Sequence, residues 1–324
     1  MNHRERFHAL MNFQSVDRLP ETEWAPWWDK TLARWHGEGL PANLTDTFAI
    51  TQYFGLDPYK QAWITFRKPG CPAGNIHTMA DYEAALPTLY PDPVWDRSLL
   101  ESWAEPQRRG ELVVWITLEG FFWGPRTLFG IEEHLLAFYD QPELMHRMNR
   151  DILAFNRRAL AQVQEVLTPD FMTFAEDMSY NHGPMIGRGQ FEEFMAPYYR
   201  QIVPELKQAG TRIFVDSDGD ITQIIDWLLG VGIEGILPLE RMAGVDVAEI
   251  RRRWPQFLLL GAFDKTVMHR GEAAIRQEFE RLMPVMRQGG FLPGVDHQTP
   301  PGVSLEQYQL FRKLLAEYCR AACR

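Results

Sequence analysis

The chain has 324 residues, of which 45% are hydrophobic and 23% are charged, the composition of a globular protein with a large core. Lys and Arg number 33 and Asp and Glu number 43, so the formal net charge is −10. The longest run of bases is Arg251, Arg252 and Arg253. An extended phosphate-binding face needs more clustered bases than this, so we expect no nucleic-acid partner.

The sequence also argues against secretion and membrane insertion. Its first ten residues include Arg4, Glu5 and Arg6 and contain no continuous apolar segment, and no stretch reaches the roughly 18 apolar residues of a membrane span. Three cysteines, Cys71, Cys319 and Cys323, are too few and too unevenly spaced for a disulfide framework. We therefore expect a cytoplasmic protein with no membrane partner.

The first half of the chain is less regular and contains three candidate strands, at residues 18–24, 62–66 and 112–118. Residues 70–106, rich in proline and aromatic side chains, are expected to form an irregular insertion. A long helix is predicted after Asp140 because Leu144, Met148 and Ile152 recur at helical spacing.

The second half alternates strands with capped helices. Its candidate strands are residues 171–175, 211–215, 233–237, 257–261 and 290–294, and helices are predicted after Asp220, Asp246 and Ser304 because each opens a capping box. This alternation indicates a parallel sheet with right-handed crossovers. With no linker in sight, residues 1–324 are predicted to form one α/β domain, an eight-stranded (β/α)8 TIM-type barrel, with a doubly wound sheet as the alternative.

Carboxylates follow most of the candidate strands, where a barrel of this kind places its active site. They are Glu21, Glu23, Glu119, Glu176, Asp177, Asp216, Asp218, Glu240, Asp264 and Asp296. If they converge, they will repel one another unless some are protonated, bind a cation, or pair with Arg126, Arg188, Arg241 or Lys265.

The sharpest local signal is the run VDSDGD, which ends at Asp220. It lacks the glutamate of a calcium loop and follows a strand instead of a helix. Side chains two apart on a strand share a face, so Asp216 and Asp218 are expected to point into the mouth together, while Asp220 caps the next helix. His297, after the last strand, is a candidate acid, base or ligand.

Aromatic residues also flank the predicted strand ends. Trp24, Trp27, Trp28, Phe121, Phe122 and Trp123 are expected to line or cover the mouth, because aromatic faces suit a flat or apolar substrate better than a phosphate. A packed rim is the alternative for the same residues.

Several longer motifs resemble the uroporphyrinogen decarboxylase superfamily, which also includes corrinoid-linked methyltransferases. They are RERFHALMNFQSVDRLP at residues 4–20, EDMSYNHGPMIGRGQFEEFMAPYYR at 176–200, DSDGD at 216–220, LPLE ending at Glu240, LLLGAFDK ending at Lys265 and GGFLPGVDHQTPPGVSLEQY ending at Tyr308. The resemblance implies an eight-fold β/α barrel with its site at the carboxyl ends of the strands.

The chain departs from that family at two informative places. Decarboxylases of the family bind their polycarboxylate substrate with an arginine-rich RQAGRY segment, where this chain has ETEWAPWWDK at residues 21–30. Its zinc methyltransferases carry His-x-Cys and a later Cys, whereas the matching positions here are Asp216, Asp218 and His297. These three side chains can still bind a divalent ion, zinc or a harder metal.

The resemblance and the residues together predict an enzyme that acts on a small molecule or transfers a corrinoid-bound methyl group. The predicted catalytic residues are His297, Asp218, Asp216, Glu176 and Tyr180. Those predicted to contact substrate are Glu23, Trp24, Phe121, Phe122, Arg188, Glu240 and Asp264.

Two other functions stay open at this point. One is decarboxylation of a porphyrinogen-like or other carboxylated substrate, in which an acid stabilises a cationic ring and His297 or Tyr180 handles protons. The other is a barrel that binds a tetrapyrrole or corrinoid without converting it. The partners left open are a small-molecule substrate, a corrinoid as co-substrate, a corrinoid protein and a second copy of the chain.

Overall fold

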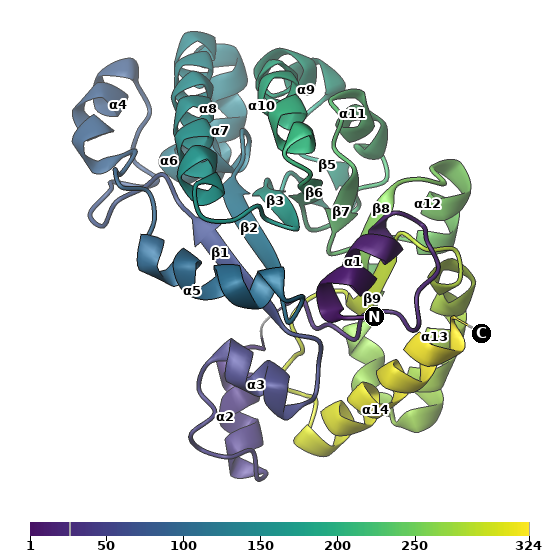
Figure 1. Ribbon diagram of the computed structural model, residues 1–324. Helices are drawn as coiled ribbons and strands as arrows, with labels where there is room; N and C mark the ends of the chain where they lie inside the picture. The colour runs from purple at the N-terminus through teal and green to yellow at the C-terminus, as the bar shows by residue number, and fades with distance from the viewer. Residues whose placement is uncertain (26, 324) are drawn as a thin grey trace. The chain divides into compact units, whose positions relative to one another are not determined.

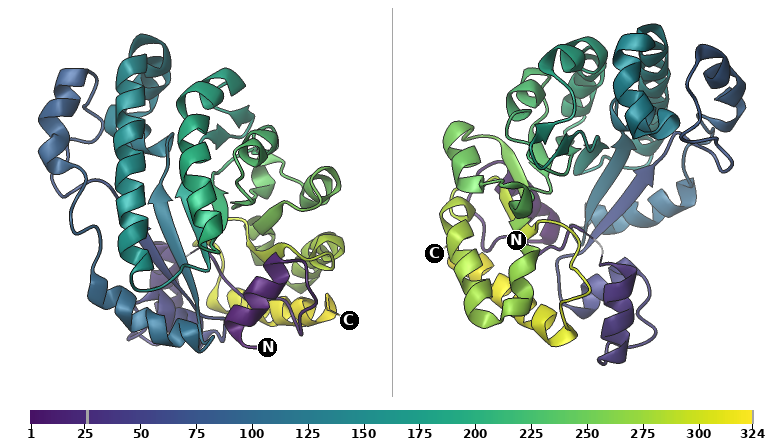
Figure 2. Two further views of the ribbon diagram at one scale, coloured as in Figure 1. Left: turned by 45° about the horizontal axis from the view of Figure 1, so that its top comes forward. Right: turned by 180° about the vertical axis from the view of Figure 1, so that it is seen from behind.

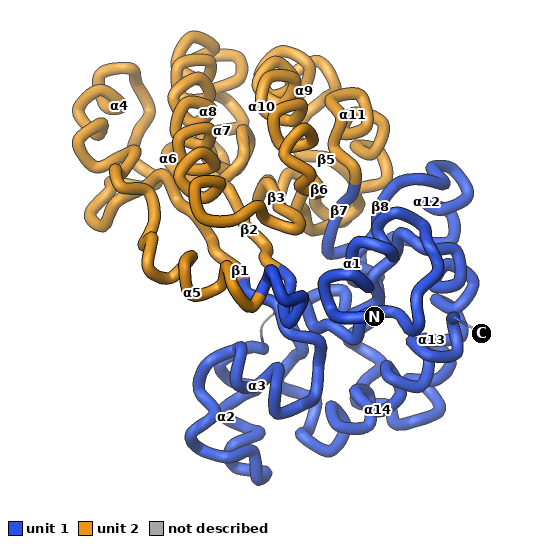
Figure 3. The backbone as a smooth tube through the Cα atoms, viewed as in Figure 1, with its two compact units in different colours: residues 1–60, 107–113, 235–324 blue, residues 61–106, 114–234 orange. Residues whose placement is uncertain are grey.

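The computed structural model describes residues 1–25 and 27–323, and their backbone forms two compact units. Unit 1 comprises residues 1–60, 107–113 and 235–324, and unit 2 comprises residues 61–106 and 114–234 (Figure 3). Each unit is built from the strand and helix alternation that the sequence predicts (Figure 1). No described helix has the length and apolar character to cross a bilayer.

Unit 2 is organised around strands in the order β1-β2-β3-β6. These are β1 (Tyr59–Ile64), β2 (Val113–Glu119), β3 (Phe171–Ala175) and β6 (Arg212–Asp216), the first residues of β1 and β2 falling in unit 1. Strands β2, β3 and β6 are parallel, with Leu118 opposite Phe174 and Phe174 opposite Val215. Every side chain of β2 and β3 is buried, as expected for parallel strands covered on both faces.

The helices of unit 2 follow its strands. They are α6 (Trp123–Phe129), α7 (Ile131–Asp140), α8 (Pro142–Gln164), α9 (Arg188–Phe194), α10 (Ala196–Gln208) and α11 (Ile225–Gly230). The long α8 confirms the helix predicted after Asp140, and it packs beside α10 (Figure 2). A small antiparallel hairpin of β4 (Ser179–Tyr180) and β5 (Gly183–Pro184) leads into α9.

Unit 1 contains the parallel strands β7 (Gly235–Leu237), β8 (Leu258–Phe263) and β9 (Phe291–Val295) in that order. Its helices are α1 (His3–Met11), α2 (Asp29–Gly37), α3 (Thr47–Tyr53), α12 (Val247–Arg253), α13 (Glu272–Met286) and α14 (Leu305–Ala321), with 3-10 turns η2 (Arg241–Ala243) and η3 (Lys265–Arg270). Asp246 caps α12 and Ser304 opens a capping box on α14, as predicted.

The α/β class is confirmed, and seven of the eight candidate runs are strands. The eighth, residues 18–24, is not assigned as a strand although it runs beside β9, where the indole nitrogen of Trp24 donates to the oxygen of Val295 (2.6 Å). Pro20 explains part of this, because proline lacks the N–H that a strand ladder needs. The described residues therefore supply seven parallel-sheet strands in two units, and the closed eight-stranded barrel of one domain stays a prediction.

Two local expectations differ from the structure. Residues 70–106 include helix α4 (Met79–Ala85), the 3-10 turn η1 (Leu86–Thr88) and most of α5 (Arg97–Arg108). Asp220 does not cap a helix: it accepts from the nitrogen of Thr222 (3.0 Å), and α11 begins only at Ile225. An aspartate that accepts from the backbone nitrogen two residues later can form a local turn as readily as a helix cap. The capping-box pattern at Asp220 therefore predicts a helix start that the structure does not have.

Candidate functional site

The carboxyl ends of β3 and β6 bring acidic residues together in unit 2. The backbone nitrogens of Glu176 and Asp177 both donate to the oxygen of Asp216, at 2.9 and 3.0 Å. This bonding continues the parallel ladder one step beyond β3, since Ala175 already pairs with Asp216. Two neighbouring strand ends are thus held in register where their acidic side chains emerge.

Glu176 is fully buried and completely hydrogen-bonded. Its carboxylate accepts from the backbone nitrogens of Phe121 (2.8 Å), Phe122 (2.7 Å) and Trp123 (3.0 Å), and also from the hydroxyl of Tyr199. Burial raises its pKa to about 7, against the effect of these donors. Through these contacts Glu176 accepts from the backbone N–H groups at the start of α6. Its burial and hydrogen bonds are therefore accounted for by a structural role as well as by the predicted catalytic role.

The packing around Glu176 leaves no spare room. A Cβ at Gly120 would lie 2.2 Å from the Glu176 carboxyl carbon, so only glycine fits there. The sequence offered no signal for Tyr199, because it lies on α10 far along the chain from the residues it serves. A buried tyrosine in an amphipathic helix is indistinguishable from an ordinary core residue in a single sequence.

Asp177 and Arg126 form an ion pair at the same strand end. One guanidinium nitrogen of Arg126 donates to both the carboxylate (2.8 Å) and the backbone oxygen (2.7 Å) of Asp177. Asp177 has φ of 43°, a left-handed conformation that is uncommon outside glycine. The double contact from Arg126 holds that conformation and occupies the arginine.

Asp216 is the most strongly perturbed acid at these strand ends. Burial, followed by the negative charges of Asp218 and Asp177, raises its pKa to about 8. Asp216 is therefore mostly protonated at neutral pH and can act as a proton donor. Retention of a proton, one of the three ways in which repulsion among the carboxylates is expected to be relieved, therefore applies to Asp216.

Tyr180 lies against the loop that carries Asp218. Gly219 has φ of +83°, and a Cβ there would lie 2.6 Å from the Tyr180 Cα, while the nitrogen of Asp220 donates to the Tyr180 oxygen (2.9 Å). The Tyr180 ring is half exposed and meets His182 edge-on at 5.8 Å. Unit 2 thus gathers four predicted catalytic residues, Glu176, Tyr180, Asp216 and Asp218, around one loop.

Unit 1 has its own charged cluster, at the carboxyl ends of β7, β8 and β9. The fully buried Asp296 accepts from the backbone nitrogens of Arg241 (3.0 Å) and Lys265 (3.2 Å), and the Lys265 ammonium lies 3.2 Å from the same carboxylate. That ammonium also lies 3.6 Å from Glu240. Burial raises the pKa of Asp296, and Lys265 opposes the rise. Ion pairing, another predicted solution, thus operates at Glu240.

Glu23 and Trp24 hold the segment that leads to His297. Glu23 is 2% exposed, one of its oxygens has no hydrogen-bond partner among the described residues, and burial raises its pKa to about 8. The Trp24 indole donates to Val295 and its ring meets the His297 ring edge-on at 6.3 Å. The protonated Glu23 carboxyl and the Trp24 indole therefore hold the backbone of Val295, two residues before His297.

The other residues predicted to contact substrate lie in different surroundings. Asp264 caps η3 by accepting from the nitrogen (2.8 Å) and hydroxyl (2.6 Å) of Thr266. Arg188, the first residue of α9, is 67% exposed and lies 4.0 Å from Glu192. Phe121 and Phe122 are fully buried in unit 2. Their contact with a substrate stays a prediction.

The aromatic residues of unit 1 divide between core and surface. Trp27 is 5% exposed and packs against Trp35, Phe54 and Tyr308, whereas Trp28 is 44% exposed. Trp27 thus lies in a packed aromatic cluster, the alternative to lining the mouth, because three core rings surround its own ring.

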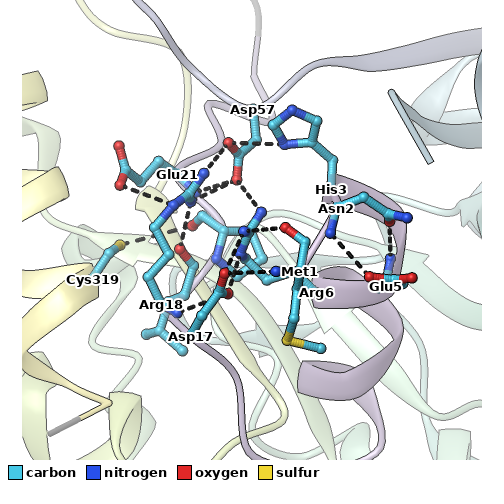
Figure 4. Close-up of polar contacts among 12 residues, drawn as sticks. Met1, Asn2, His3, Glu5, Arg6, Asp17, Arg18, Glu21, Asp57 and Cys319 are labelled. Atoms are coloured by element: carbon cyan, nitrogen blue, oxygen red, sulfur yellow. Dashed lines mark hydrogen bonds and ion pairs between the residues drawn. The ribbon is translucent and has the colours of Figure 1, made fainter. Parts of the chain in front are cut away.

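Glu21, one of the acids after the first candidate strand, belongs to a buried ionic network (Figure 4). Its carboxylate lies 2.7 Å from Arg312 and 3.6 Å from Arg18, and Arg18 in turn lies 2.6 Å from Asp57. The last turns of α14, including Cys319, lie beside it. These contacts give Glu21 a structural role in joining residues 1–60 to α14.

Within residues 1–25 and 27–323, no group of three or more His, Cys, Asp or Glu side chains is arranged to hold a metal ion. The predicted ligands divide between the units, with Asp216 and Asp218 in unit 2 and His297 in unit 1. Their convergence on one ion stays a prediction.

Comparison with known proteins adds two findings. The family model of uroporphyrinogen decarboxylase (URO-D) matches residues 116–318. The solved structure of a methyltransferase from Methanosarcina mazei superposes with a TM-score of 0.67 over 98% of this chain and 99% of its own, at 13% sequence identity. At that identity the likeness shows a common fold. No curated protein matches the sequence.

Proposed function

Because the chain belongs to the uroporphyrinogen decarboxylase family, we propose that it is an enzyme of this family that transfers a methyl group between a small molecule or corrinoid and an acceptor. One observation favours this reaction over porphyrinogen decarboxylation. The cations at the strand ends are already engaged: Arg126 by Asp177, Lys265 by Asp296 and Glu240. The Arg241 guanidinium donates to a backbone oxygen.

A porphyrinogen with eight carboxylates needs cationic partners, and each engaged pair would have to break to supply one. Breaking the pair between Lys265 and the buried Asp296 leaves that carboxylate without its ammonium partner, which costs about 3–5 kcal/mol. A neutral or cationic small molecule makes no such demand. The charge balance in each unit therefore disfavours a polyanionic substrate.

The acids of unit 2 have distinct roles in this proposal. Asp216, protonated at neutral pH, donates a proton to the departing group, while the acceptor gives up its own proton as it takes the methyl group. Asp218 lies beside Asp216, where its carboxyl group can stabilise developing positive charge. Tyr180, whose backbone lies against this loop and whose side chain is half exposed, orients the substrate through its hydroxyl. His297 exchanges protons at the end of β9.

A divalent ion would fit the chemistry of the predicted ligands, since the mutual repulsion that raises the pKa of Asp216 is what a bound cation relieves. Asp216, Asp218 and His297 are the residues that would hold it. When bound, such an ion would polarise an acceptor and lower its pKa. Metal analysis of the purified protein and of an Asp218→Asn variant tests this part separately.

Decarboxylation is the second candidate, and the protonated Asp216 is the observation that favours it. An acid with a pKa of about 8 can protonate a ring carbon before carboxylate loss and remain beside the cationic ring that results. After CO2 leaves, Tyr180 or His297 would protonate the carbon that carried the carboxylate, and the proton on the ring carbon would return to Asp216. The same residues thus serve both reactions, and substrate charge distinguishes them.

Three incubations of the purified protein separate the candidates. Methylcobalamin with a thiol acceptor reports methyl transfer through the corrin absorbance, uroporphyrinogen reports carboxyl loss, and methylcobalamin alone reports binding. Methyl loss that requires both the protein and the acceptor supports the proposal. Carboxyl loss supports decarboxylation, and saturable corrinoid binding without turnover identifies a non-catalytic binding protein.

A further inference from the structure

Helix α7 of unit 2 is packed on its inner side. There His134, Ala137 and Phe138 are buried, and the Phe138 ring lies 5.2 Å from the Phe194 ring and 6.4 Å from the Phe122 ring. These contacts attach α7 to the core of unit 2, and its other side faces solvent. A helix side that faces solvent normally carries polar residues, whereas this one is largely apolar.

Four apolar residues form the outer face of α7. Ile131 is 44% exposed, Leu136 54% and Tyr139 72%, and Leu135 is half-buried. At about 100° per residue they span an arc of about 140°, and Ile131, Leu135 and Tyr139 form the i, i+4, i+8 ridge against which a second helix packs. Scattered exposed apolar residues are ordinary, but a contiguous group on one helix face is typical of an interaction site.

The Tyr139 ring is held in place although it is exposed. The side-chain amide of Gln190, on α9, donates to the Tyr139 hydroxyl (2.6 Å). Because this bond already orders the side chain, covering the ring with a partner costs little further conformational entropy. Tyrosine is also one of the residues that contribute most of the binding energy in protein interfaces. Tyr139 is therefore suited to anchor a partner on the outer face of α7.

The charges on α7 define the chemistry of that partner. Glu132 lies within the apolar arc, and Glu133 and Asp140 lie along one edge of it. All three are exposed, and in the part of the chain that the structure describes none of them makes an ion pair. Lysines or arginines of a partner would complement these acids. The same three charges would repel an anionic lipid surface, so a basic protein segment fits the face better than a membrane does.

We propose that the outer face of α7 binds a basic amphipathic helix of a partner protein. The apolar residues of the partner lie against Leu136 and Tyr139, and its lysines or arginines pair with Glu132, Glu133 and Asp140. The chain passes from the end of β2 through the seven residues of α6 to α7, so the face is joined directly to one of the strand ends of unit 2. The inference rests on the surface of α7 and does not depend on the proposed function.

Fluorescence anisotropy of labelled peptides, titrated with the full chain, tests the proposal. The probe is an amphipathic helix of leucine and lysine, about 14 residues long, and its controls carry glutamate in place of lysine or serine in place of leucine. We expect saturable binding of the probe with a dissociation constant of about 10–100 μM, the range of a small transient interface, and at least about tenfold weaker binding of both controls. Equal binding of all three peptides, or no saturable binding of the probe, overturns the proposal.

Two variants and their matched controls assign the binding to α7. Leu136→Ser and Glu132→Lys should each weaken probe binding about tenfold, since they remove a covered leucine or reverse a paired charge. Leu229→Ser on α11 and Glu306→Lys on α14, also at exposed positions, should bind like the parent chain. Equal affinities of the α7 variants and their controls would refute the assignment, and circular dichroism verifies that each variant is folded.

Two further measurements distinguish a partner helix from other occupants of the face. The parent chain should not sediment with phosphatidylcholine vesicles or with vesicles that also contain phosphatidylglycerol, and sedimentation velocity should give the same mass for the parent and Leu136→Ser. Vesicle binding that Leu136→Ser abolishes would assign the face to lipid. A larger species that Leu136→Ser dissociates would assign it to a second copy of the chain, and either result overturns the proposal.

Discussion

Replacing Asp216 with asparagine should change how stability depends on pH. The carboxyl has an ordinary pKa of 3.8 and a pKa of about 8 in the folded chain, so between these values the folded state holds a proton that the unfolded state has lost. Stability is then fully present below pH 4 and falls as pH rises toward 8. Asparagine mimics the protonated side chain and removes this dependence.

The magnitude follows from the shift. One proton held only by the folded state gives a slope of about 1.4 kcal/mol per pH unit, and the whole shift corresponds to about 6 kcal/mol. Asp216 keeps partial exposure, and solvent screening reduces its repulsion from Asp218 and Asp177. We therefore expect about half of that, roughly 3 kcal/mol summed from pH 4 to pH 8.

Urea unfolding followed by circular dichroism at pH 5, 6, 7 and 8 measures the effect. The free energy of unfolding of Asp216→Asn, relative to the parent chain, should rise steadily with pH. Glu23 and Glu176 also have raised pKa values, but they are common to both proteins and cancel in the difference. Asp226→Asn, at an exposed position on α11, is the control and should show no such rise.

The reasoning is refuted if the difference between Asp216→Asn and the parent is the same at all four pH values. A difference that falls with pH would mean that Asp216 is ionised and stabilised by a cation in the folded chain. Carbon NMR of the carboxyl groups, compared between parent and variant, locates the titration directly.

Three further substitutions test the packing of the site. Lys265→Met should destabilise the chain by about 3–5 kcal/mol in urea unfolding, since it leaves the buried Asp296 carboxylate without its ammonium partner. Arg252→Met at an exposed pair should cost less than about 1 kcal/mol, and equal costs would contradict the importance of the Lys265–Asp296 pair. Gly219→Ala should lower the midpoint of thermal unfolding more than Gly244→Ala, because both have positive φ but only the first would place a Cβ against backbone. Glu176→Gln should cost about 1–3 kcal/mol, because its NH2 group would face backbone N–H donors. An unchanged unfolding midpoint would argue against its capping role.

The sequence predicts the regular elements of this fold well where burial and capping act locally. Strands β2 and β3 are continuous apolar runs, and Ser304 marks the start of α14 by a capping box, so both signals lie within a few residues of the element they announce. Residues 18–24 are predicted as a strand but are not assigned as one, in part because Pro20 lacks the N–H that a strand ladder needs. The spacing of apolar residues in a sequence indicates which side chains are buried, but it does not indicate whether the backbone N–H groups are hydrogen-bonded in a sheet.

The site is less predictable because its contacts join distant parts of the chain. The sequence places acids after the strands and names Arg126 and Lys265 among four candidate cations, but it cannot say which acid each one meets. Arg126 meets Asp177 across 51 residues and Lys265 meets Asp296 across 31. Whether a strand-end acid is engaged by backbone donors, as Glu176 is, or keeps its proton, as Asp216 does, depends on burial that only the folded chain defines.

The rate of methyl transfer from methylcobalamin to a thiol, compared among the parent chain, Asp218→Asn and Asp226→Asn, tests the proposed reaction most directly. The parent and Asp226→Asn should remove the methyl group at equal rates, and Asp218→Asn should be at least about a hundredfold slower, the usual effect of losing one acid–base or electrostatic group. Absence of methyl loss in all three, together with carboxyl loss from uroporphyrinogen by the parent chain, would contradict it.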